Sequence, residues 1–255
     1  MNDQETKYLL YIQEQEGTDV SFVKVGDGHK NLIVSFGCAN PHGGFDRKKS
    51  LMKLMSEDGD TDVLYLRDMK EFQVGRGRHK HIKLLGRWYL GGLTGIGKNI
   101  IHTISFLKNI FKNYENVICT GTSMGGYASI LFGSLLNVNY VIVGNAQTDL
   151  GYVLEHTRRH GRGKISQLSK RKKECPKTWE KYSNLDTFVS ESVNYQLYYT
   201  GESDYIGNRA MGGYNEAILH STHHLDNIKN CKSVTEFDSD IRYSNFIEKI
   251  SSCLI

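Results

Sequence analysis

Near Gly37 the hydrophobic periodicity of the chain changes, and few folds are compatible with this change. Beyond this point, short runs of β-branched and aromatic residues alternate with stretches of helical periodicity, a pattern typical of a parallel sheet covered by helices on both faces. Strand-like runs occur near residues 7–13, 19–25, 31–37, 62–67, 116–121, 140–145, 194–200 and 232–237. Helical periodicity occurs near residues 46–57, 98–112, 124–136, 214–229 and 243–252. We therefore predict an α/β fold with a mostly parallel, eight-stranded sheet.

The first three strand-like runs are expected to pair in a different way. Short turns separate them, and Gly26-Asp27-Gly28 has the composition of a hairpin connection. We therefore expect the sheet to begin as an antiparallel meander. The 255 residues suit one large domain, and no linker or internal repeat interrupts them. The prediction is a single domain over residues 1–255, with an insertion at about residues 151–192.

Composition excludes several classes of protein. No segment has the roughly 18 uninterrupted apolar residues that a membrane-spanning helix needs, so we expect no membrane span. The first seven residues have neither a basic start nor an apolar core, which argues against a secretory signal and favours the cytoplasm. The formal net charge of +4 is small, and no helix-turn-helix, finger or RNA-binding motif is found, so nucleic acid is not an expected partner.

The cysteines do not indicate a cross-linked or metal-binding protein. They are odd in number, widely spaced and never arranged as C-x-x-C, so neither a disulfide framework nor a zinc site is predicted. We expect buried free thiols at Cys38, Cys119, Cys175, Cys231 and Cys253. No metal and no resident cofactor are predicted.

Positive charge is concentrated after the sixth strand-like run. Residues 151–175 contain eight lysines and arginines against two acidic residues. Two interpretations stay open: a solvated helix face, which is the usual cause of such a run, or a site for an anionic ligand. Under the second interpretation, Arg158 and Arg159 would bind the substrate. A second basic cluster, within residues 76–87, would frame the same site.

A glycine-rich loop raises the question of nucleotide binding. Residues 92–98 match G-x-x-x-x-G-K, but Asn99 stands where a phosphate-binding loop has the hydroxyl that holds Mg²⁺. No strand-like run directly precedes the loop. We interpret it as a structural lead into the helix at 98–112.

The most informative segment, residues 117–127, runs from an apolar strand through a glycine-flanked serine into a helix. It fits G-x-S-x-G, the motif of a nucleophile elbow, in which a tight, strained turn exposes the serine oxygen above the edge of the sheet. Ser123 is the candidate nucleophile, although a glycine-rich turn of purely structural use is the alternative. The following helix has an apolar face for the sheet, formed by Tyr127, Ile130, Leu131, Ser134 and Leu135.

Partners for this serine are expected at the same edge of the sheet. The backbone amide of Met124, at the start of the helix, can donate a hydrogen bond to an oxyanion. A second donor is expected in the loop after the third strand, from the amide of Gly37 or Cys38. Asp204, with Glu202 in reserve, follows the seventh strand and is the candidate acid that orients a catalytic base.

Three segments together resemble a known family. They are Gly121-Thr122-Ser123-Met124-Gly125-Gly126, Val143-Gly144-Asn145-Ala146-Gln147 and Thr200-Gly201-Glu202-Ser203-Asp204, and Trp88-Tyr89-Leu90 adds to the likeness. They resemble the α/β-hydrolase-fold enzymes of bacterial capsule biosynthesis, notably the capsular polysaccharide O-acetyltransferases. The resemblance covers roughly residues 30–205. It implies a three-layer α/β-hydrolase-like sandwich with a basic cap insertion, and a serine that takes an acetyl group from acetyl-CoA and passes it to a sugar hydroxyl.

The catalytic histidine departs from that family's pattern. In the family it follows the last strand, but here no histidine follows His224. A serine without a base is a weak nucleophile, so the base must come from another position. The candidates are His42, His156 and His160, near the expected active edge, against the three on the expected helix at 214–229, His220, His223 and His224.

Two functions from different classes follow. The first is acyl transfer through Ser123, most simply O-acetyl transfer to a bacterial surface or capsular saccharide, or ester hydrolysis on one, with acetyl-CoA as the implied donor and an anionic saccharide or other small acyl acceptor. The second is a catalytically inactive, hydrolase-like accessory protein that binds an anionic glycan or a biosynthetic partner. The residues do not separate hydrolase from transferase, because the first half of the reaction is the same in both.

Overall fold

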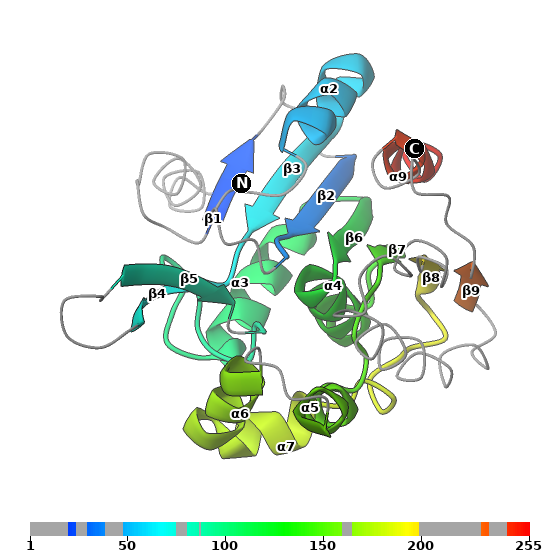
Figure 1. Ribbon diagram of the computed structural model, residues 1–255. Helices are drawn as coiled ribbons and strands as arrows, with labels where there is room; N and C mark the ends of the chain where they lie inside the picture. The colour runs from blue at the N-terminus through cyan, green and yellow to red at the C-terminus, as the bar shows by residue number, and fades with distance from the viewer. Residues whose placement is uncertain are drawn as a thin grey trace.

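The computed structural model describes residues 20–23, 30–38, 48–74, 81–86, 88–159, 165–198, 231–234 and 244–255 (Figure 1). The strands are β1 (Val20–Val23), β2 (Asn31–Phe36), β3 (Thr61–Leu66), β4 (Met69–Val74), β5 (His81–Gly86), β6 (Asn116–Thr122), β7 (Tyr140–Gly144), β8 (Asn194–Tyr198) and β9 (Cys231–Val234). The helices are α2 (Lys48–Asp58), α3 (Ile100–Phe111), α4 (Met124–Leu136), α5 (Leu150–Arg159), α6 (Ile165–Glu174), α7 (Pro176–Tyr182) and α9 (Ser244–Ser251). The strand expected at 7–13 and the helix expected at 214–229 lie outside the described residues.

Seven of these strands form one sheet in the order β1-β3-β2-β6-β7-β8-β9. Every neighbouring pair is parallel except β1 with β3. The prediction of a mostly parallel sheet in an α/β fold is therefore confirmed, with seven strands in the described part of the chain. The order reverses between β2 and β6, because β2 leads to β3 on one side while the chain returns to β6 on the other. Open α/β sheets bind their ligands at such a switch point, outside the carboxyl ends of the strands.

The antiparallel meander expected at the start of the sheet is wrong for β1 and β2. β1 pairs antiparallel with β3, and β2 lies on the other side of β3 in parallel register. A hairpin through Gly26-Asp27-Gly28 would need β1 and β2 to be neighbours, which the strand order excludes. Burial gives the physical reason: all six residues of β2 are buried, as in a strand that lies inside a parallel sheet.

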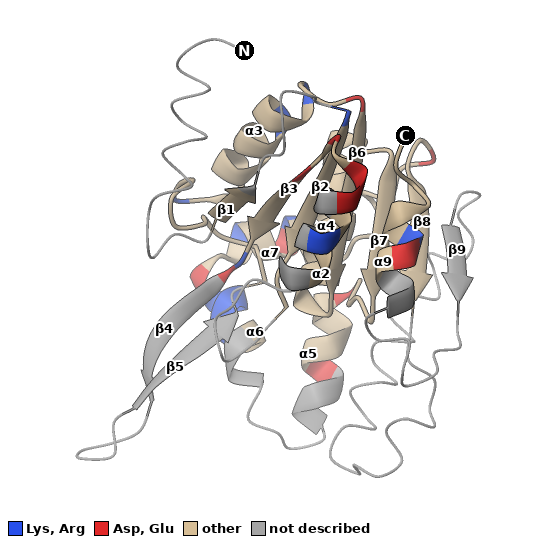
Figure 2. Cartoon of the chain, turned by 90° about the horizontal axis from the view of Figure 1, so that it is seen from above, with Lys and Arg blue, Asp and Glu red and all other residues tan. Residues whose placement is uncertain are grey.

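Alternate strand residues face two separate hydrophobic layers. Leu32 and Phe36 of β2 belong to the layer that holds the apolar residues of α3 and α4. Ile33, between them, packs in the opposite layer with Leu51 of α2 and Ile250 of α9. Figure 2 shows α2 and α9 together on one side of the sheet. Helices thus cover both faces, as the change in periodicity predicts.

Three short helices, α5, α6 and α7, form an insertion between β7 and β8 and lie side by side (Figure 1). Their apolar residues, among them Leu150, Trp179 and Tyr182, belong to the same hydrophobic layer as α4. The hydroxyl of Tyr127, on α4, donates a hydrogen bond of 2.6 Å to the carbonyl oxygen of Tyr182. The insertion therefore contributes to the burial of α4, in which every residue from Met124 to Ser134 is buried. The sequence indicates one apolar face, and the structure buries the helix on more sides.

β4 and β5 form a separate two-stranded antiparallel sheet that the sequence did not indicate. β5 ends at Gly86, and residues 88–91 between it and Gly92 form turns and bends, so no strand directly precedes the glycine-rich loop, as the sequence predicts. That loop folds tightly on itself: a Cβ atom on Gly92 would lie 1.8 Å from the carbonyl oxygen of Gly97. The close approach favours the structural interpretation of the loop over nucleotide binding.

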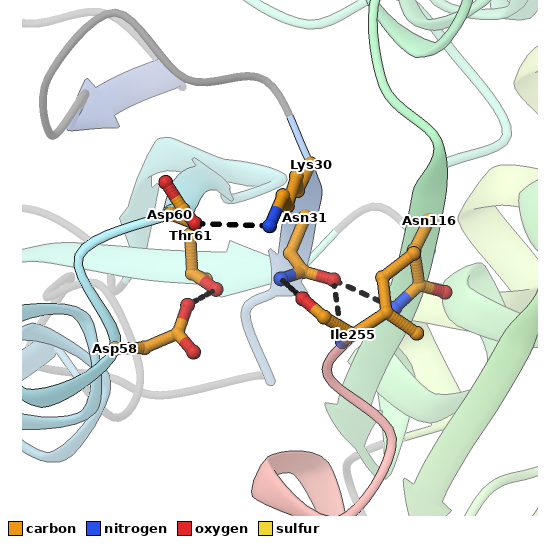
Figure 3. Close-up of polar contacts among 7 residues, drawn as sticks. All are labelled: Lys30, Asn31, Asp58, Asp60, Thr61, Asn116 and Ile255. Carbon is orange, nitrogen blue, oxygen red and sulfur yellow. Dashed lines mark hydrogen bonds and ion pairs between the residues drawn. The ribbon is translucent and has the colours of Figure 1, made fainter.

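At the amino ends of the strands, side-chain amides hold the last residues of the chain (Figure 3). The Nδ2 atom of Asn31 donates to the carbonyl oxygen of Ile255 at 3.1 Å, and the Ile255 amide donates to Oδ1 of Asn31 at 3.2 Å. Asn116 donates to Oδ1 of Asn31 at 2.9 Å and to the carbonyl oxygen of Cys253 at 2.8 Å. These contacts fix α9 against β2 and β6.

The thiols are less uniform than expected. Cys119 and Cys253 are buried, but Cys38 and Cys175 are half-buried, and the side chain of Cys231 lies outside the description. Burial raises the pKa of the Cys119 thiol, so this group on β6 stays protonated in the hydrophobic core. Within the described residues, no helix is both long and apolar enough to cross a membrane, and no three His, Cys, Asp or Glu side chains are grouped to hold a metal.

Candidate active site

Ser123 lies at the switch point of the sheet, directly after β6 and directly before α4. Both the strand and the helix that the motif requires are present. Its backbone has φ 53° and ψ −119°, a strained conformation for a residue with a side chain. Its side chain makes no capping hydrogen bond to the helix, so the hydroxyl is not used to stabilise α4. Ser123 therefore has the backbone geometry expected of a nucleophile elbow.

Close backbone contacts explain the glycines around this serine. A Cβ atom on Gly125 would lie 2.1 Å from the carbonyl oxygen of Phe36, at the end of β2. A Cβ atom on Gly121 would lie 2.5 Å from the backbone of Gly125, and one on Gly126 would lie 2.8 Å from the side chain of Ala146. No side chain fits at these three positions without a shift of the backbone. The turn can therefore approach β2 and β7 only because the motif is glycine-rich.

The amide of Met124 is placed as predicted for an oxyanion donor. Met124 is the first residue of α4, so its N–H has no acceptor within the helix and lies at the positive end of the helix dipole. Its side chain is fully buried, and its sulfur accepts a hydrogen bond of 3.4 Å from the amide of Trp88. Met124 is thus anchored by its side chain and offers its backbone to the site.

The sequence leaves two backbone amides, those of Gly37 and Cys38, as candidates for the second oxyanion donor. The Gly37 amide already donates to the carbonyl oxygen of Leu66 at 2.7 Å, so it is not available to an oxyanion. Cys38 follows it, half-buried, in the loop after β2. Tyr89 fixes the start of this loop, because its hydroxyl lies 3.0 Å from the carbonyl oxygen of Gly37 and 3.1 Å from that of Leu66. Cys38 remains the candidate for the second donor.

Gln147 is the residue at this site whose contact with the nucleophile the sequence did not indicate. It follows β7, the strand beside β6, and its side chain is fully buried. Its Nε2 atom lies 3.4 Å and its Oε1 atom 3.5 Å from Oγ of Ser123. The position of Gln147 in the sequence could have indicated this contact. The carboxyl ends of neighbouring parallel strands meet at one edge of the sheet, so polar residues after β7 come close to the serine after β6.

Several predicted site residues lie outside the described side chains. Asp204 and Glu202 come after β8, which runs parallel to β7 and ends at the same edge as Ser123, but neither residue is described. The same holds for the side chains of all six candidate histidines, His42, His156, His160, His220, His223 and His224. The structure therefore brings together Ser123, Met124 and the loop of Cys38.

The basic insertion is described in part. Arg158 and Arg159 are at the end of α5, where the backbone but not the side chains is described. On α6, Lys170 pairs with Glu174 at 3.7 Å, as expected of a solvated helix face. Arg171 differs from its neighbours, since it is 8% exposed and packs against Gly91, where a Cβ atom would lie 2.3 Å from its guanidinium. Lys170 thus fits a solvated helix face, and Arg171 contributes to packing.

Comparison with known proteins gives a fold and no family. No protein-family model matches the chain, and no curated protein matches it in sequence. Among solved structures, the chain is similar to the capsule O-acetyltransferase of Neisseria meningitidis serogroup A, with a TM-score of 0.55, 13% identity, and coverage of 93% of this chain and 92% of that one. A histidine-to-alanine variant of that enzyme, in complex with CoA, gives a TM-score of 0.53.

Two other structures extend the similarity. Esterase B of Lactobacillus rhamnosis gives a TM-score of 0.51 at 12% identity, covering 96% of this chain and 89% of that one. A glycosylation-associated protein complex from Streptococcus agalactiae gives 0.54 at 17% identity, but the match covers 91% of this chain and only 43% of that longer one. The chain is therefore structurally similar to α/β-hydrolase-fold proteins, including capsule O-acetyltransferases and esterases, at low sequence identity.

Proposed function

We propose that this chain is an acyl-transfer enzyme whose nucleophile is Ser123. The observation that carries the proposal is the placement of a serine at positive φ between a central strand and a helix N-terminus, at the switch point of the sheet. A strained serine at such a place is unusual outside a functional site. The similarity in fold to acyltransferases and esterases supports the same class of reaction.

The reaction follows from the placement of these groups. Oγ of Ser123 attacks the carbonyl carbon of the acyl donor while its proton passes to a base, and the amides of Met124 and Cys38 stabilise the negative charge on the carbonyl oxygen. Collapse of the tetrahedral intermediate releases the leaving group, which takes the proton back from the base. The acyl group on Ser123 then passes to an acceptor hydroxyl, whose proton goes to the base. Collapse of this second tetrahedral intermediate releases Oγ of Ser123, which takes the proton back from the base.

The finer assignment is O-acetyl transfer from acetyl-CoA to a bacterial surface or capsular saccharide, and ester hydrolysis on such a saccharide is the close alternative. The base belongs to one of the six candidate histidines, and Asp204 orients it. Arg158 and Arg159 on the insertion would attract an anionic acceptor. Acetyl-CoA is a substrate in this scheme, in agreement with the CoA complex of a protein of similar fold.

Labelling with a fluorophosphonate tests the proposal, because this probe reacts only with an activated serine. We expect one probe per chain, located at Ser123 by peptide mass spectrometry, and no labelling of Ser123→Ala. Hydrolysis of p-nitrophenyl acetate should fall to background in the variant, a loss of about 10³-fold or more. A folded wild-type chain that stays unlabelled would overturn the proposal.

A binding role is the second candidate, and a specific observation favours it. The hydrogen-bond partner of Ser123 Oγ in the described part of the chain is the amide of Gln147, which cannot act as a base. Without a base, the fold would serve as an accessory protein that binds an anionic glycan or a biosynthetic partner. The absence of labelling, together with saturable binding of an acidic oligosaccharide, would support this role.

A further inference from the structure

The side chain of Gln147 is in direct contact with the reacting oxygen of the candidate site. Its amide nitrogen lies 3.4 Å and its amide oxygen 3.5 Å from Oγ of Ser123. The side chain is fully buried, so bulk water does not compete for these contacts. A buried amide with both ends beside one hydroxyl restrains the position of that hydroxyl.

A second contact fixes which end of the amide faces which group. Nε2 of Gln147 also lies 3.2 Å from the carbonyl oxygen of Asn145. A carbonyl oxygen only accepts hydrogen bonds, so the NH₂ end must face it, and the orientation of the amide is determined. The backbone of Asn145 is itself held, because its backbone N–H donates to the carbonyl oxygen of Tyr198 at 2.6 Å. Its backbone φ is 48°. Gln147 is therefore anchored to the ends of both β7 and β8.

The anchored amide also contacts the nucleophile. Nε2 carries two hydrogens, and it lies within hydrogen-bond distance of both the carbonyl oxygen of Asn145 and Oγ of Ser123. The hydroxyl can also donate to Oε1. Because both contacts are long, the amide restrains the position of Oγ while the hydroxyl proton stays available to a base. When a base removes that proton, the N–H of Gln147 remains as a donor to the negative oxygen.

We propose that Gln147 is a positioning residue for Ser123: it donates a hydrogen bond to Oγ, holds this oxygen in its attacking position and stabilises the charge that forms there as the proton leaves. The inference rests on the proposed acyl transfer. It assigns to the segment after β7 a role in the reaction, and it explains why a polar side chain is fully buried at this edge of the sheet.

Two variants of similar size test the role of the donor. Gln147→Met keeps the length of the side chain and removes the hydrogen bond, so we expect the rate of fluorophosphonate labelling to fall about tenfold at every pH. With p-nitrophenyl acetate, kcat should fall and KM should not change, because the contact is to the nucleophile. Gln147→Glu donates only while its carboxyl group is protonated, so its labelling rate should fall as the pH rises through the pKa of that group.

A matched control separates this role from a loss of stability. Gln196 is a glutamine on β8, the strand beside β7, but its amide contacts Cys253 and Tyr198, away from Ser123. Gln196→Met should leave the labelling rate at the wild-type value, and circular dichroism confirms that each variant is folded.

The outcomes distinguish the two proposals. If wild type is labelled at Ser123 and both Gln147 variants are labelled at the same rate and with the same pH profile, the role of Gln147 is overturned and acyl transfer stands. If folded wild type is not labelled, acyl transfer fails and the role of Gln147 fails with it. The inference is supported if Gln147→Met is labelled more slowly than wild type and the labelling rate of Gln147→Glu falls as the pH rises through the pKa of its carboxyl group.

Discussion

At the scale of single residues, the geometry of the site depends on three glycines that have no Cβ atom. Gly121, Gly125 and Gly126 each face backbone or side-chain atoms closer than 3.0 Å from where a Cβ would be. These glycines let the turn at Ser123 approach the end of β2, from which the loop of Cys38 continues. The amides that are candidates for the oxyanion site are close to the serine because of this approach.

Gly125→Ala should be the most damaging small substitution in this turn. The added methyl group would meet the carbonyl oxygen of Phe36, a backbone atom that cannot move without a shift of β2. We expect a loss of about 3 kcal/mol in the free energy of unfolding, measured by urea denaturation.

The matched control for that variant is Gly151→Ala. Gly151 also lies in the first turns of a helix, α5, and the atom nearest to its added methyl group is Oδ1 of Asp149 at 3.1 Å. The change should be neutral or stabilising, because alanine favours the helix by about 1 kcal/mol over glycine. Equal stabilities of the two variants would show that the contact with Phe36 carries no cost.

At the scale of elements, α4 connects the sheet to the insertion. Its sequence predicts one apolar face, yet its residues from Met124 to Ser134 are buried, because the sheet lies on one side and α5 to α7 on another. The hydroxyl of Tyr127 is the polar link between α4 and α7. Burial raises the pKa of this hydroxyl well above its usual value, so it stays protonated and donates at any physiological pH.

Tyr127→Phe should loosen the insertion. The change leaves the carbonyl oxygen of Tyr182 without this donor and should lower the free energy of unfolding by about 1 kcal/mol. Limited trypsin digestion should cut faster at Lys177 and Lys181 on α7 than in wild type. Tyr182→Phe is the control, because the Tyr182 hydroxyl forms no hydrogen bond within the described part of the chain. If both variants resist trypsin as wild type does, the link does not hold the insertion.

At the scale of the whole molecule, stability should decline at high pH. The hydroxyl of Tyr114, after α3, donates to Oδ2 of the buried Asp62 on β3 at 2.7 Å. Burial, followed by the hydrogen bond and the charge of Asp62, raises the pKa of Tyr114. The folded chain therefore keeps this proton above pH of about 10, where the tyrosine of the unfolded chain loses it. The resulting stability is complete below that pH and is lost as the pH rises further.

Tyr114→Phe tests this dependence. Near neutral pH the variant should be less stable than wild type by about 1–3 kcal/mol, because Asp62 loses a donor in a buried position. Above pH of about 10 the difference should shrink by at most about 1.4 kcal/mol per pH unit, and partial exposure of Tyr114 reduces that figure. Urea denaturation from pH 7 to 11 measures the difference, and a gap that stays constant over this range would contradict the role assigned to Tyr114.

The sequence alone determined the local features of this protein. Strand and helix periodicity along the chain predicts β2, β3, β6, β7, β8, α2, α3 and α4 close to their observed bounds. The turn at Ser123 was also predictable, because its glycines are neighbours in the sequence and their effect is local. The amide of Met124 follows from that turn by the same reasoning.

The tertiary structure decided which distant segments meet. The pairing of β1 with β3, the burial of α4 by the insertion and the packing of Arg171 on Gly91 all join residues far apart in the chain. So does the contact of Gln147 with Ser123, 24 residues earlier. Periodicity shows which face of an element is apolar, but it does not show which other element covers that face, because that choice depends on the burial of the whole chain at once.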